Sequence, residues 1–272
     1  MTDLNPHGEQ MADPSMLRTL EAQARAIWPQ EEPLIRRYGL PDDVRILDGG
    51  CGTGEASSRL AELFPRSRVL GVDILDQHLE LARTKYARLA PRLSFEHQSL
   101  FELAAADGAF DLTVCRHVVH SIPHADRVYA ELKRVTRRGG RLHLIPEDYD
   151  MLHFERRARH DPRVFWYEAP EQFGRKTGTD LCVGRHTYHH LLKLGLEQIT
   201  VDYIIVDTLR VPRETFARII EAWRDGYAGV TAEVTRFTSA EAVAHFDAMI
   251  ANIRDPEAYA VWMVPVVSAI VP

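Results

Sequence analysis

The stretch Val44–Glu55, with the sequence VRILDGGCGTGE, constrains the fold of this chain more than any other. Val44, Ile46 and Leu47 form a short apolar run of the kind found in a buried strand of a parallel sheet. Three alternating glycines follow, and glycine lets a backbone turn tightly and approach a ligand closely. We therefore expect a strand, a tight glycine-rich turn and then a helix over residues 56–64.

A second apolar run, Arg68–Val72, ends at Asp73, nineteen residues after Gly54. In a doubly wound sheet, an acidic side chain at the end of the second strand lies within reach of a pair of ribose hydroxyls. A dinucleotide-binding enzyme would show the pattern G-x-G-x-x-G. This chain instead has an acidic residue, Asp48, before the glycines and lacks the dinucleotide spacing.

These two stretches resemble motifs I and II of the class I S-adenosylmethionine (SAM) dependent methyltransferases, and the resemblance covers roughly Arg45 to Asp148. It implies that the backbone around Gly50–Gly52 lies against the methionine part of SAM. It also implies that Asp73 binds the ribose hydroxyls, that Ile74 flanks the adenine and that S-adenosylhomocysteine is the product. The cofactor-binding residues expected from the resemblance are Asp48, Gly49, Gly50, Gly52, Gly54, Asp73, Ile74, Ser99, Leu100 and Arg116.

Ser99 and Arg116 are two expected cofactor-binding positions with different roles. Ser99 stands where many family members carry an Asp that accepts a hydrogen bond from the adenine amino group. A serine hydroxyl can accept the same bond but carries no charge. Arg116 follows the apolar run Phe110–Cys115, and the resemblance implies that its backbone carbonyl faces the amino group of SAM.

Further apolar runs extend the pattern to seven strands. The resemblance implies an α/β fold with a doubly wound, mostly parallel, Rossmann-like sheet in the order 3-2-1-4-5-7-6 and helical lid insertions. Pro265, in the middle of the last run, predicts a bulge or an exposed edge there. The remaining strands are expected at Leu93–His97, Phe110–Cys115, Arg141–Ile145, Gln198–Asp207 and Ala258–Val271.

We expect four segments along the chain. Residues 1–40 form an N-terminal arm, flexible over Met1–Pro14, and two lid helices separated near Pro29. Residues 41–150 form the SAM-binding core, and residues 151–183 form a lid or substrate insertion of loops and short helices. Residues 184–272 complete the core and carry an inserted helix pair. Lids of this kind usually determine substrate choice.

Composition narrows the class of protein. A net charge of −6 and a pI near 6.1 disfavour a large nucleic-acid footprint, which needs a basic stripe. The three cysteines are too few for a framework of disulfides and fit a reducing cytosol. We find no apolar signal core and no stretch apolar enough to span a bilayer, so we expect a cytoplasmic protein without membrane or nucleic-acid partners, as a monomer or a homodimer.

Methyl transfer from SAM needs an aimed nucleophile, and for an alcohol, phenol or amine a nearby base helps. A base must lie at the carboxyl ends of the fourth and fifth strands, where the sequence offers His117, His120 and Glu147. Imidazole titrates near neutral pH and is a plausible base. His120 has an alternative role as a structural residue, and Glu147 and Asp148 could orient a histidine, bind an amine or cap a helix.

Aromatic residues near this edge are candidates for substrate contacts. Tyr149 and Trp166 could stack on a planar or cationic substrate, and Trp28 on the leading helix could line the pocket. Core packing is the alternative for both tryptophans. Two histidine groups have metal-like spacing, but no matching carboxylates or cysteines accompany them, so we expect no metal.

The predicted function is transfer of the methyl group of SAM to an oxygen or nitrogen of a small molecule, possibly in secondary metabolism. The acidic balance and the lid insertions favour the small molecule. Two alternatives remain open: a protein or tRNA methyltransferase, and a SAM-binding protein that uses the sulfonium charge for chemistry other than transfer.

Overall fold

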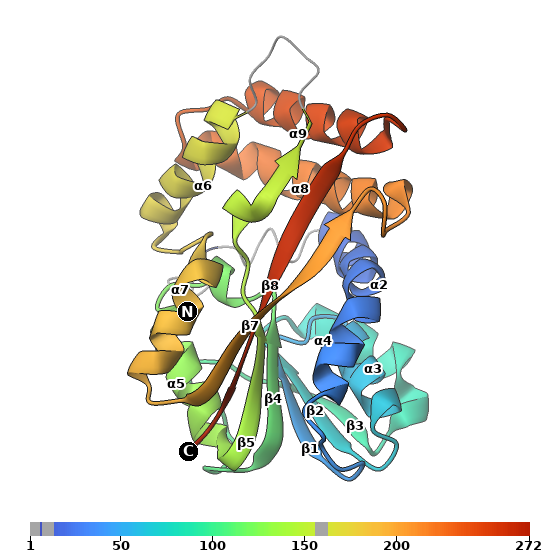
Figure 1. Ribbon diagram of the computed structural model, residues 1–272, viewed down its shortest axis with the longest axis vertical. Coiled ribbons are helices and arrows are strands. Elements are labelled where there is room, and N and C mark those ends of the chain that lie inside the picture. The colour runs from blue at the N-terminus through green and yellow to red at the C-terminus, as the bar shows by residue number, and fades with distance from the viewer. Residues whose placement is uncertain (1–5, 7–13, 156–162) are drawn as a thin grey trace.

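The computed structural model describes residue 6, residues 14–155 and residues 163–272 (Figure 1). Most of the arm expected at Met1–Pro14, and residues 156–162 of the expected insertion, lie outside the described residues. The described chain contains one eight-stranded sheet in which the order β3-β2-β1-β4-β5-β8 continues to β6, with β7 also paired to β8. Within these ranges, no helix is long and apolar enough to cross a membrane.

The parallel half of the sheet forms the base of the molecule. Its strands are β1 (Arg45–Gly49), β2 (Arg68–Asp73), β3 (Leu93–His97), β4 (Phe110–Arg116) and β5 (Thr136–Ile145). Helices cover both faces of these strands, which favours the apolar residues at their centres, such as Leu47, Val72 and Val114. Since the strands are parallel, their carboxyl ends meet at one edge, which is the upper edge of this parallel half in Figure 1. Open α/β sheets bind ligands at this edge.

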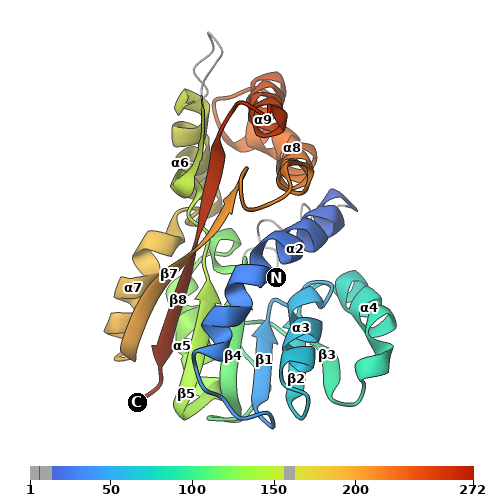
Figure 2. The same ribbon diagram turned by 45° about the vertical axis from the view of Figure 1, so that its right-hand side comes forward.

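Helices cover the two faces of this parallel half (Figure 2). On one face lie α2 (Pro14–Arg36), α3 (Glu55–Leu63) and α4 (Asp76–Lys85), followed by the short η2 (Ala87–Leu89). On the other face lie α5 (Ala125–Val135) and α7 (Val183–Lys193). Fully buried leucines, Leu60 and Leu79 on the first face and Leu132 and Leu191 on the second, fill the space between helices and sheet.

The antiparallel half extends the sheet upward beyond the carboxyl edge. Its strands are β6 (Leu152–Phe154), β7 (Glu197–Asp207) and β8 (Ala260–Ile270). One part of β8 pairs with β5 through Val267–Ile270, and its other part pairs with β6 through Ala260–Trp262. The seven predicted strands therefore have the predicted order, and the short β6 is an eighth strand that the sequence analysis did not predict.

A second helical layer surrounds the far ends of β7 and β8 (Figures 1 and 2). It consists of α6 (Arg163–Thr177), α8 (Arg213–Val234) and α9 (Ser239–Arg254). Phe216 and Ile220 of α8, Met249 of α9 and Trp262 of β8 are buried in one apolar cluster. The two short helices η3 (Val119–Ser121) and η4 (Tyr149–Met151) lie at the junction of this layer with the parallel half.

The leading segment is one helix, not the two helices predicted. Helix α2 continues through Pro29 and Pro33. A proline within a helix removes a backbone hydrogen bond and costs stability. Ile27, Glu31 and Ile35, spaced at four residues, are all fully buried, so tertiary burial along one face holds the helix together across both prolines.

The prediction for Pro265 is also corrected, because β8 is not an edge strand. Pro265 faces Tyr203 of β7 on one side and lies between the parts of β8 that pair with β5 and β6 on the other. The first turn of α7 fills this gap: a Cβ on Gly184 would come within 2.9 Å of the Pro265 ring. A proline is tolerated at a position where ladder pairing is interrupted.

Candidate active site

The turn after β1 is held tightly against the sheet. Gly50 and Gly52 have φ values of +72° and +53°, which favour glycine. The backbone N–H groups of Gly50 and Cys51 both donate to the carbonyl of Val72. A Cβ on Gly50 would lie 2.3 Å from a methyl carbon of Val118, whereas one on Gly52 would meet only Leu20 of α2, at 3.2 Å. The α-carbon face of Gly52 is therefore covered by a flexible side chain alone.

Asp73 and the residues beside it could hold a nucleoside. The two carboxylate oxygens of Asp73 accept hydrogen bonds from the N–H groups of Gly52, at 2.8 Å, and Leu75, at 3.0 Å. Each oxygen keeps a lone pair for a ribose hydroxyl. Ile74 next to it is 38% exposed and offers an apolar face, and Ser99 is half-buried with its hydroxyl accepting from Phe101 N–H. These residues fit a ribose and an adenine.

Other predicted cofactor positions pack beneath the turn. Leu100 is buried, and a Cβ on Gly49 would lie 2.8 Å from its side chain, so this leucine supports the turn from below. A Cβ on Gly54 would collide with the Phe95 ring at 2.7 Å. Asp48 is 1% exposed and accepts a hydrogen bond from Ser57 Oγ. Burial raises the pKa of Asp48 to about 6, against the opposing effects of that hydrogen bond and of the Arg116 charge.

Arg116 connects the end of β4 to the N-terminal helix. Its Nε lies 2.8 Å from Oε1 of Glu31, and Nε2 of His143 lies 3.1 Å from the same oxygen. Burial alone would raise the pKa of Glu31, but the charge of Arg116 and the hydrogen bond of His143 outweigh it and lower the pKa. Glu31 is thus a buried anion that fastens α2 across the carboxyl edge. The role implied for the Arg116 carbonyl stays a prediction.

Sequence reasoning missed Glu31. The signal was present, because Glu31 stands four residues from both Ile27 and Ile35 on the apolar face of a predicted helix. An acidic residue on such a face needs a buried cation or donor. Because two helices separated near Pro29 were expected, the four-residue spacing of Ile27, Glu31 and Ile35 was not recognised as one helix face.

The structure brings His117 and Glu147 together at the ends of β4 and β5. Nδ1 of His117 hydrogen-bonds Oε1 of Glu147, whose side chain is 1% exposed. His117 has a φ of +54°, and its N–H donates to the carbonyl of Ile145, so the backbone holds the ring in place. Among the described residues, neither Nε2 of His117 nor Oε2 of Glu147 has a hydrogen-bond partner, although both atoms are buried. Two acceptor positions are therefore left for a bound molecule.

The neighbouring histidine has different surroundings. His120 is 5% exposed, and its Nε2 lies 3.4 Å from the hydroxyl of Tyr149. The two rings meet edge to face with centroids 5.6 Å apart. His120 therefore contacts the aromatic lining of the upper layer, whereas His117 contacts Glu147.

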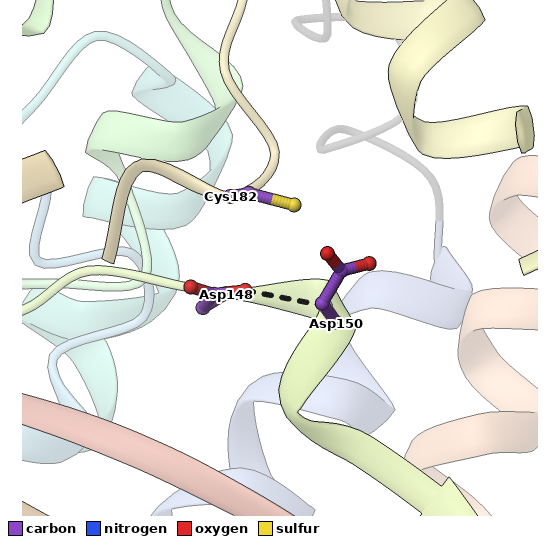
Figure 3. Close-up of side chains that lie close together, drawn as sticks. All are labelled: Asp148, Asp150 and Cys182. Atoms are coloured by element: carbon purple, nitrogen blue, oxygen red, sulfur yellow. Dashed lines mark hydrogen bonds between the residues drawn. The ribbon is translucent and has the colours of Figure 1, made fainter. Parts of the chain in front are cut away.

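The two adjacent acids at the end of β5 separate. Asp148 is fully buried and binds the guanidinium of Arg185, with Nε at 2.7 Å from Oδ2, and its Oδ1 accepts from Asp150 N–H. Asp148, Asp150 and Cys182 lie close enough to hold a metal ion (Figure 3). Arg185 reaches both carboxylates, however, and supplies the positive charge at this position. Asp148 thus caps η4 and joins β5 to α7.

An aromatic pocket opens between η4, α6 and α8. Its free space, including the part open to solvent, is about 510 Å³. The predicted residues Tyr149 and Trp166 line it, and Trp166 Nε1 donates to the Tyr149 carbonyl at 2.6 Å. The other lining residues were not predicted, because they come from distant parts of the chain. They include Phe165, Phe173, Trp223 and Tyr227.

Trp28 lies elsewhere. Its ring is buried in the core beside Ile46 and Leu60, and its Nε1 donates to Glu32 at 3.1 Å. It is not among the residues that line the aromatic pocket in the described structure. The core-packing alternative describes its position, so Trp28 is withdrawn as a substrate-contacting residue.

Comparison with known proteins identifies the lower half. Residues 46–140 match a family model described as a methyltransferase domain. The chain carries a class I SAM-dependent methyltransferase domain. Within it lie the glycine-rich turn, Asp73 and the end of β4, so the family model covers the expected cofactor site but ends before Glu147 and the whole of the upper helical layer.

Curated relatives match the same region. A malonyl-(acyl-carrier protein) O-methyltransferase of Legionella pneumophila is 40% identical over 93 residues, which are 34% of this chain and 32% of the relative. A SAM-dependent Diels-Alderase, iccD, of Talaromyces variabilis is 33% identical over 123 residues, or 42% of this chain and 40% of the relative. The methyltransferase chain thus spans well under half the length of both relatives.

Solved structures share the fold more widely. The crystal structure of the (4+2)-cyclase SpnF superposes with a TM-score of 0.57 at 21% identity, covering 89% of this chain and 81% of that chain. The phosphoethanolamine N-methyltransferase 2 of Haemonchus contortus in complex with SAM gives a TM-score of 0.56 at 17% identity, covering 90% and 53%. At these identities, the comparison establishes a Rossmann-like methyltransferase fold for the two halves of the chain.

Proposed function

We propose that this methyltransferase transfers the methyl group of SAM to an oxygen or nitrogen of a small molecule. One observation carries the proposal. At the carboxyl ends of β4 and β5, His117 and Glu147 form a buried pair with one acceptor atom each left over among the described residues. The pair lies at the edge of the sheet where the glycine-rich turn and Asp73 also lie.

The residues of the turn would hold the cofactor. Asp73 offers acceptor positions for the ribose hydroxyls, Ile74 an apolar face for the adenine, and Gly52 a backbone whose α-carbon meets only the flexible side chain of Leu20. When bound, SAM supplies an electrophilic methyl group, and the electron pair of the broken C–S bond stays on sulfur. The protein must then aim the acceptor and remove its proton.

Glu147 orients His117 for this task. A carboxylate only accepts, so Nδ1 of His117 carries the proton in this hydrogen bond and Nε2 keeps its lone pair. Nε2 can therefore take the proton of a hydroxyl or amine as the acceptor attacks, and Glu147 compensates the resulting imidazolium. Thus His117 is the proposed base and Glu147 its positioning residue.

The upper layer supports a small acceptor. The aromatic pocket adjoins the pair through Tyr149 and through Trp262, whose ring lies 6.1 Å from that of His117 and 5.4 Å from that of Trp223. An apolar pocket with few polar groups suits a small organic molecule. Such a lining gives a protein side chain or a tRNA little to bind by charge, so these acceptors fit less well.

A second candidate function uses the same site without transfer. The Diels-Alderase iccD and the cyclase SpnF are named for ring formation, and the largely apolar pocket would also suit a substrate that cyclises. Here the sulfonium would serve as a fixed charge. The buried base, His117 with Glu147, favours transfer because ring formation by cycloaddition moves no proton to a base.

The test is direct. The purified chain is incubated with methyl-labelled SAM and a panel of small phenols, alcohols and amines, and S-adenosylhomocysteine formation is followed with product mass. We expect label in a product heavier by one CH₂ group, lost in His117→Ala. A product of unchanged mass would support the cyclase alternative. Tight binding of S-adenosylhomocysteine without any transfer to this panel would count against the proposed reaction.

A further inference from the structure

The buried pair of His117 and Glu147 also constrains which molecule can enter. Both atoms left over, Nε2 of His117 and Oε2 of Glu147, are acceptors when the histidine is neutral. A group that donates a hydrogen bond satisfies them. A group that only accepts hydrogen bonds leaves both of these buried acceptors unsatisfied, which disfavours its binding.

The charged side chains at the carboxyl ends of the strands also disfavour an anionic ligand beside Glu147. Arg116 is paired with Glu31, and Arg185 is paired with Asp148 and Asp150. Among the described residues, the ion pairs of Glu147 are limited to the one with His117. Both of these guanidinium groups are therefore already paired with carboxylates other than Glu147.

The charge of Glu147 reaches the aromatic pocket. Burial raises the pKa of Tyr149 and of Tyr227, and the negative charge of Glu147 raises both further. Both tyrosines line the pocket, and their raised pKa values keep both hydroxyls protonated at neutral pH. The negative charge of Glu147 thus acts on two residues of the largely apolar, aromatic pocket wall.

From this arrangement we infer that the pocket takes a flat, apolar molecule whose acceptor end is an uncharged or positively charged hydrogen-bond donor, an amine or a hydroxyl, and that Glu147 excludes molecules ending in a carboxylate or a phosphate. The inference rests on the proposed function for the identity of the reacting end. This preference would distinguish the chain from the relative named as a malonyl-(acyl-carrier protein) O-methyltransferase. A carboxylate group on the ligand would lie beside the like charge of Glu147.

Aromatic contacts set the other end of the molecule. Trp166 lies parallel to Trp223, with ring centroids 6.5 Å apart and an interplanar angle of 8°. Tyr149 meets both rings edge to face at 5.7 Å and 5.3 Å. Flat rings stack favourably against such walls, and a cationic amine gains a further attraction from their faces.

The experiment uses three probes with the same naphthalene body: naphthylethylamine, naphthylethanol and naphthylacetate. Each is titrated by calorimetry into the full chain, with and without saturating S-adenosylhomocysteine. We expect the amine and the alcohol to bind and naphthylacetate to bind at least roughly tenfold more weakly, because its carboxylate would lie beside the like charge of Glu147. If the amine binds more tightly than the alcohol, the ammonium group is the preferred donor. If the two bind equally, a neutral donor is sufficient.

Two variants locate the source of the discrimination. Glu147→Gln should bring the affinity for naphthylacetate close to that for naphthylethanol, because it removes the charge and keeps the shape. Asp150→Asn is the matched control: it removes an equal charge three residues away, from a carboxylate bound by Arg185, and should keep the preference. Unchanged melting temperature and S-adenosylhomocysteine affinity would confirm that Glu147→Gln is folded.

The result that overturns the inference is naphthylacetate binding to the wild-type chain as tightly as naphthylethanol, which needs no variant to fold. Retained discrimination in a folded Glu147→Gln protein would overturn the role of Glu147. The readout is binding, so it is separate from the proposed function: a chain that discriminates among the probes but transfers no methyl group supports the pocket and contradicts the reaction.

Discussion

The lower half of the molecule, with the glycine-rich turn, and the upper aromatic layer reach the same edge of the sheet by different means. The turn, Asp73 and Ser99 are each set by short stretches that follow one strand. The aromatic pocket instead combines Tyr149 after β5 with Trp166 from α6 and Trp223 from α8. The family model covers the first region and stops before the second. One sheet thus carries a turn built from a local stretch of sequence and a pocket built from distant parts of the chain.

Removing the base should have the largest effect. His117→Ala should lower turnover by roughly 10²–10⁴-fold while SAM affinity barely changes, because His117 acts on the acceptor's proton. Turnover is measured at saturating SAM, and SAM affinity by calorimetry. His120→Ala is the matched histidine control, and its melting temperature separates a loss of packing against Tyr149 from a loss of chemistry. Near-normal turnover in His117→Ala would remove it as the base.

Removing the ribose ligand should damage the lower region alone. Asp73→Ala should cost roughly 1.5–3 kcal/mol of SAM binding by removing charge-assisted hydrogen bonds. Asp76→Ala removes a nearby carboxylate whose side chain is 71% exposed, and it should leave SAM affinity unchanged. Calorimetry of both variants decides: equal affinities would falsify the assignment of Asp73 to the ribose.

Trimming the pocket should damage the upper region alone. Phe173→Leu removes part of the aromatic wall and should weaken acceptor or naphthyl-probe binding by severalfold, about 1 kcal/mol, with unchanged SAM affinity. Phe237→Leu is the control, because Phe237 is buried against Phe165, at 5.0 Å between centroids, without lining the pocket. If both variants weaken the probe equally, the effect is one of general packing.

The two regions should also respond to pH in opposite directions, beginning with His245 of the upper layer. Burial among aromatic rings lowers its pKa to about 3. The unfolded chain then binds more protons, so stability is lost as the pH falls below the ordinary histidine range. Lowering the pH from about 7.5 to about 5 should cost roughly 2 kcal/mol of unfolding free energy, and His245→Phe should abolish that loss. Denaturant titrations at the two pH values measure it.

Asp48 in the lower region gives the smaller, opposite effect. Burial raises its pKa to about 6, above the ordinary aspartate value, so its contribution to stability is complete at acidic pH and is lost as the pH rises through about 6. Asp48→Asn should therefore raise the unfolding free energy by roughly 1 kcal/mol more at pH about 7.5 than at about 5. The amide can still accept from Ser57. A stabilisation independent of pH would contradict a charged Asp48.

The sheet and the glycine-rich turn could be predicted from short stretches of sequence. The parallel strands β1, β2 and β4 each contain a short apolar run, and the turn requires glycine where a Cβ on Gly50 would overlap Val118. These are local properties of the chain, so short stretches were enough for the family resemblance, and the resemblance implied the strand order. His117 and Glu147 were predicted to lie at the same edge for the same reason, since both follow parallel strands.

The partners of those residues depend on contacts between distant parts of the chain. Glu31 reaches Arg116 from 85 positions away along the chain, and the lining of the pocket comes from η4, α6 and α8. Trp28 and Trp166 were equal candidates by residue type, but one packs in the core and the other lines the pocket. Periodicity shows which face of a helix is buried, yet burial against core and burial against a ligand leave the same pattern, so the helix packing alone distinguishes them.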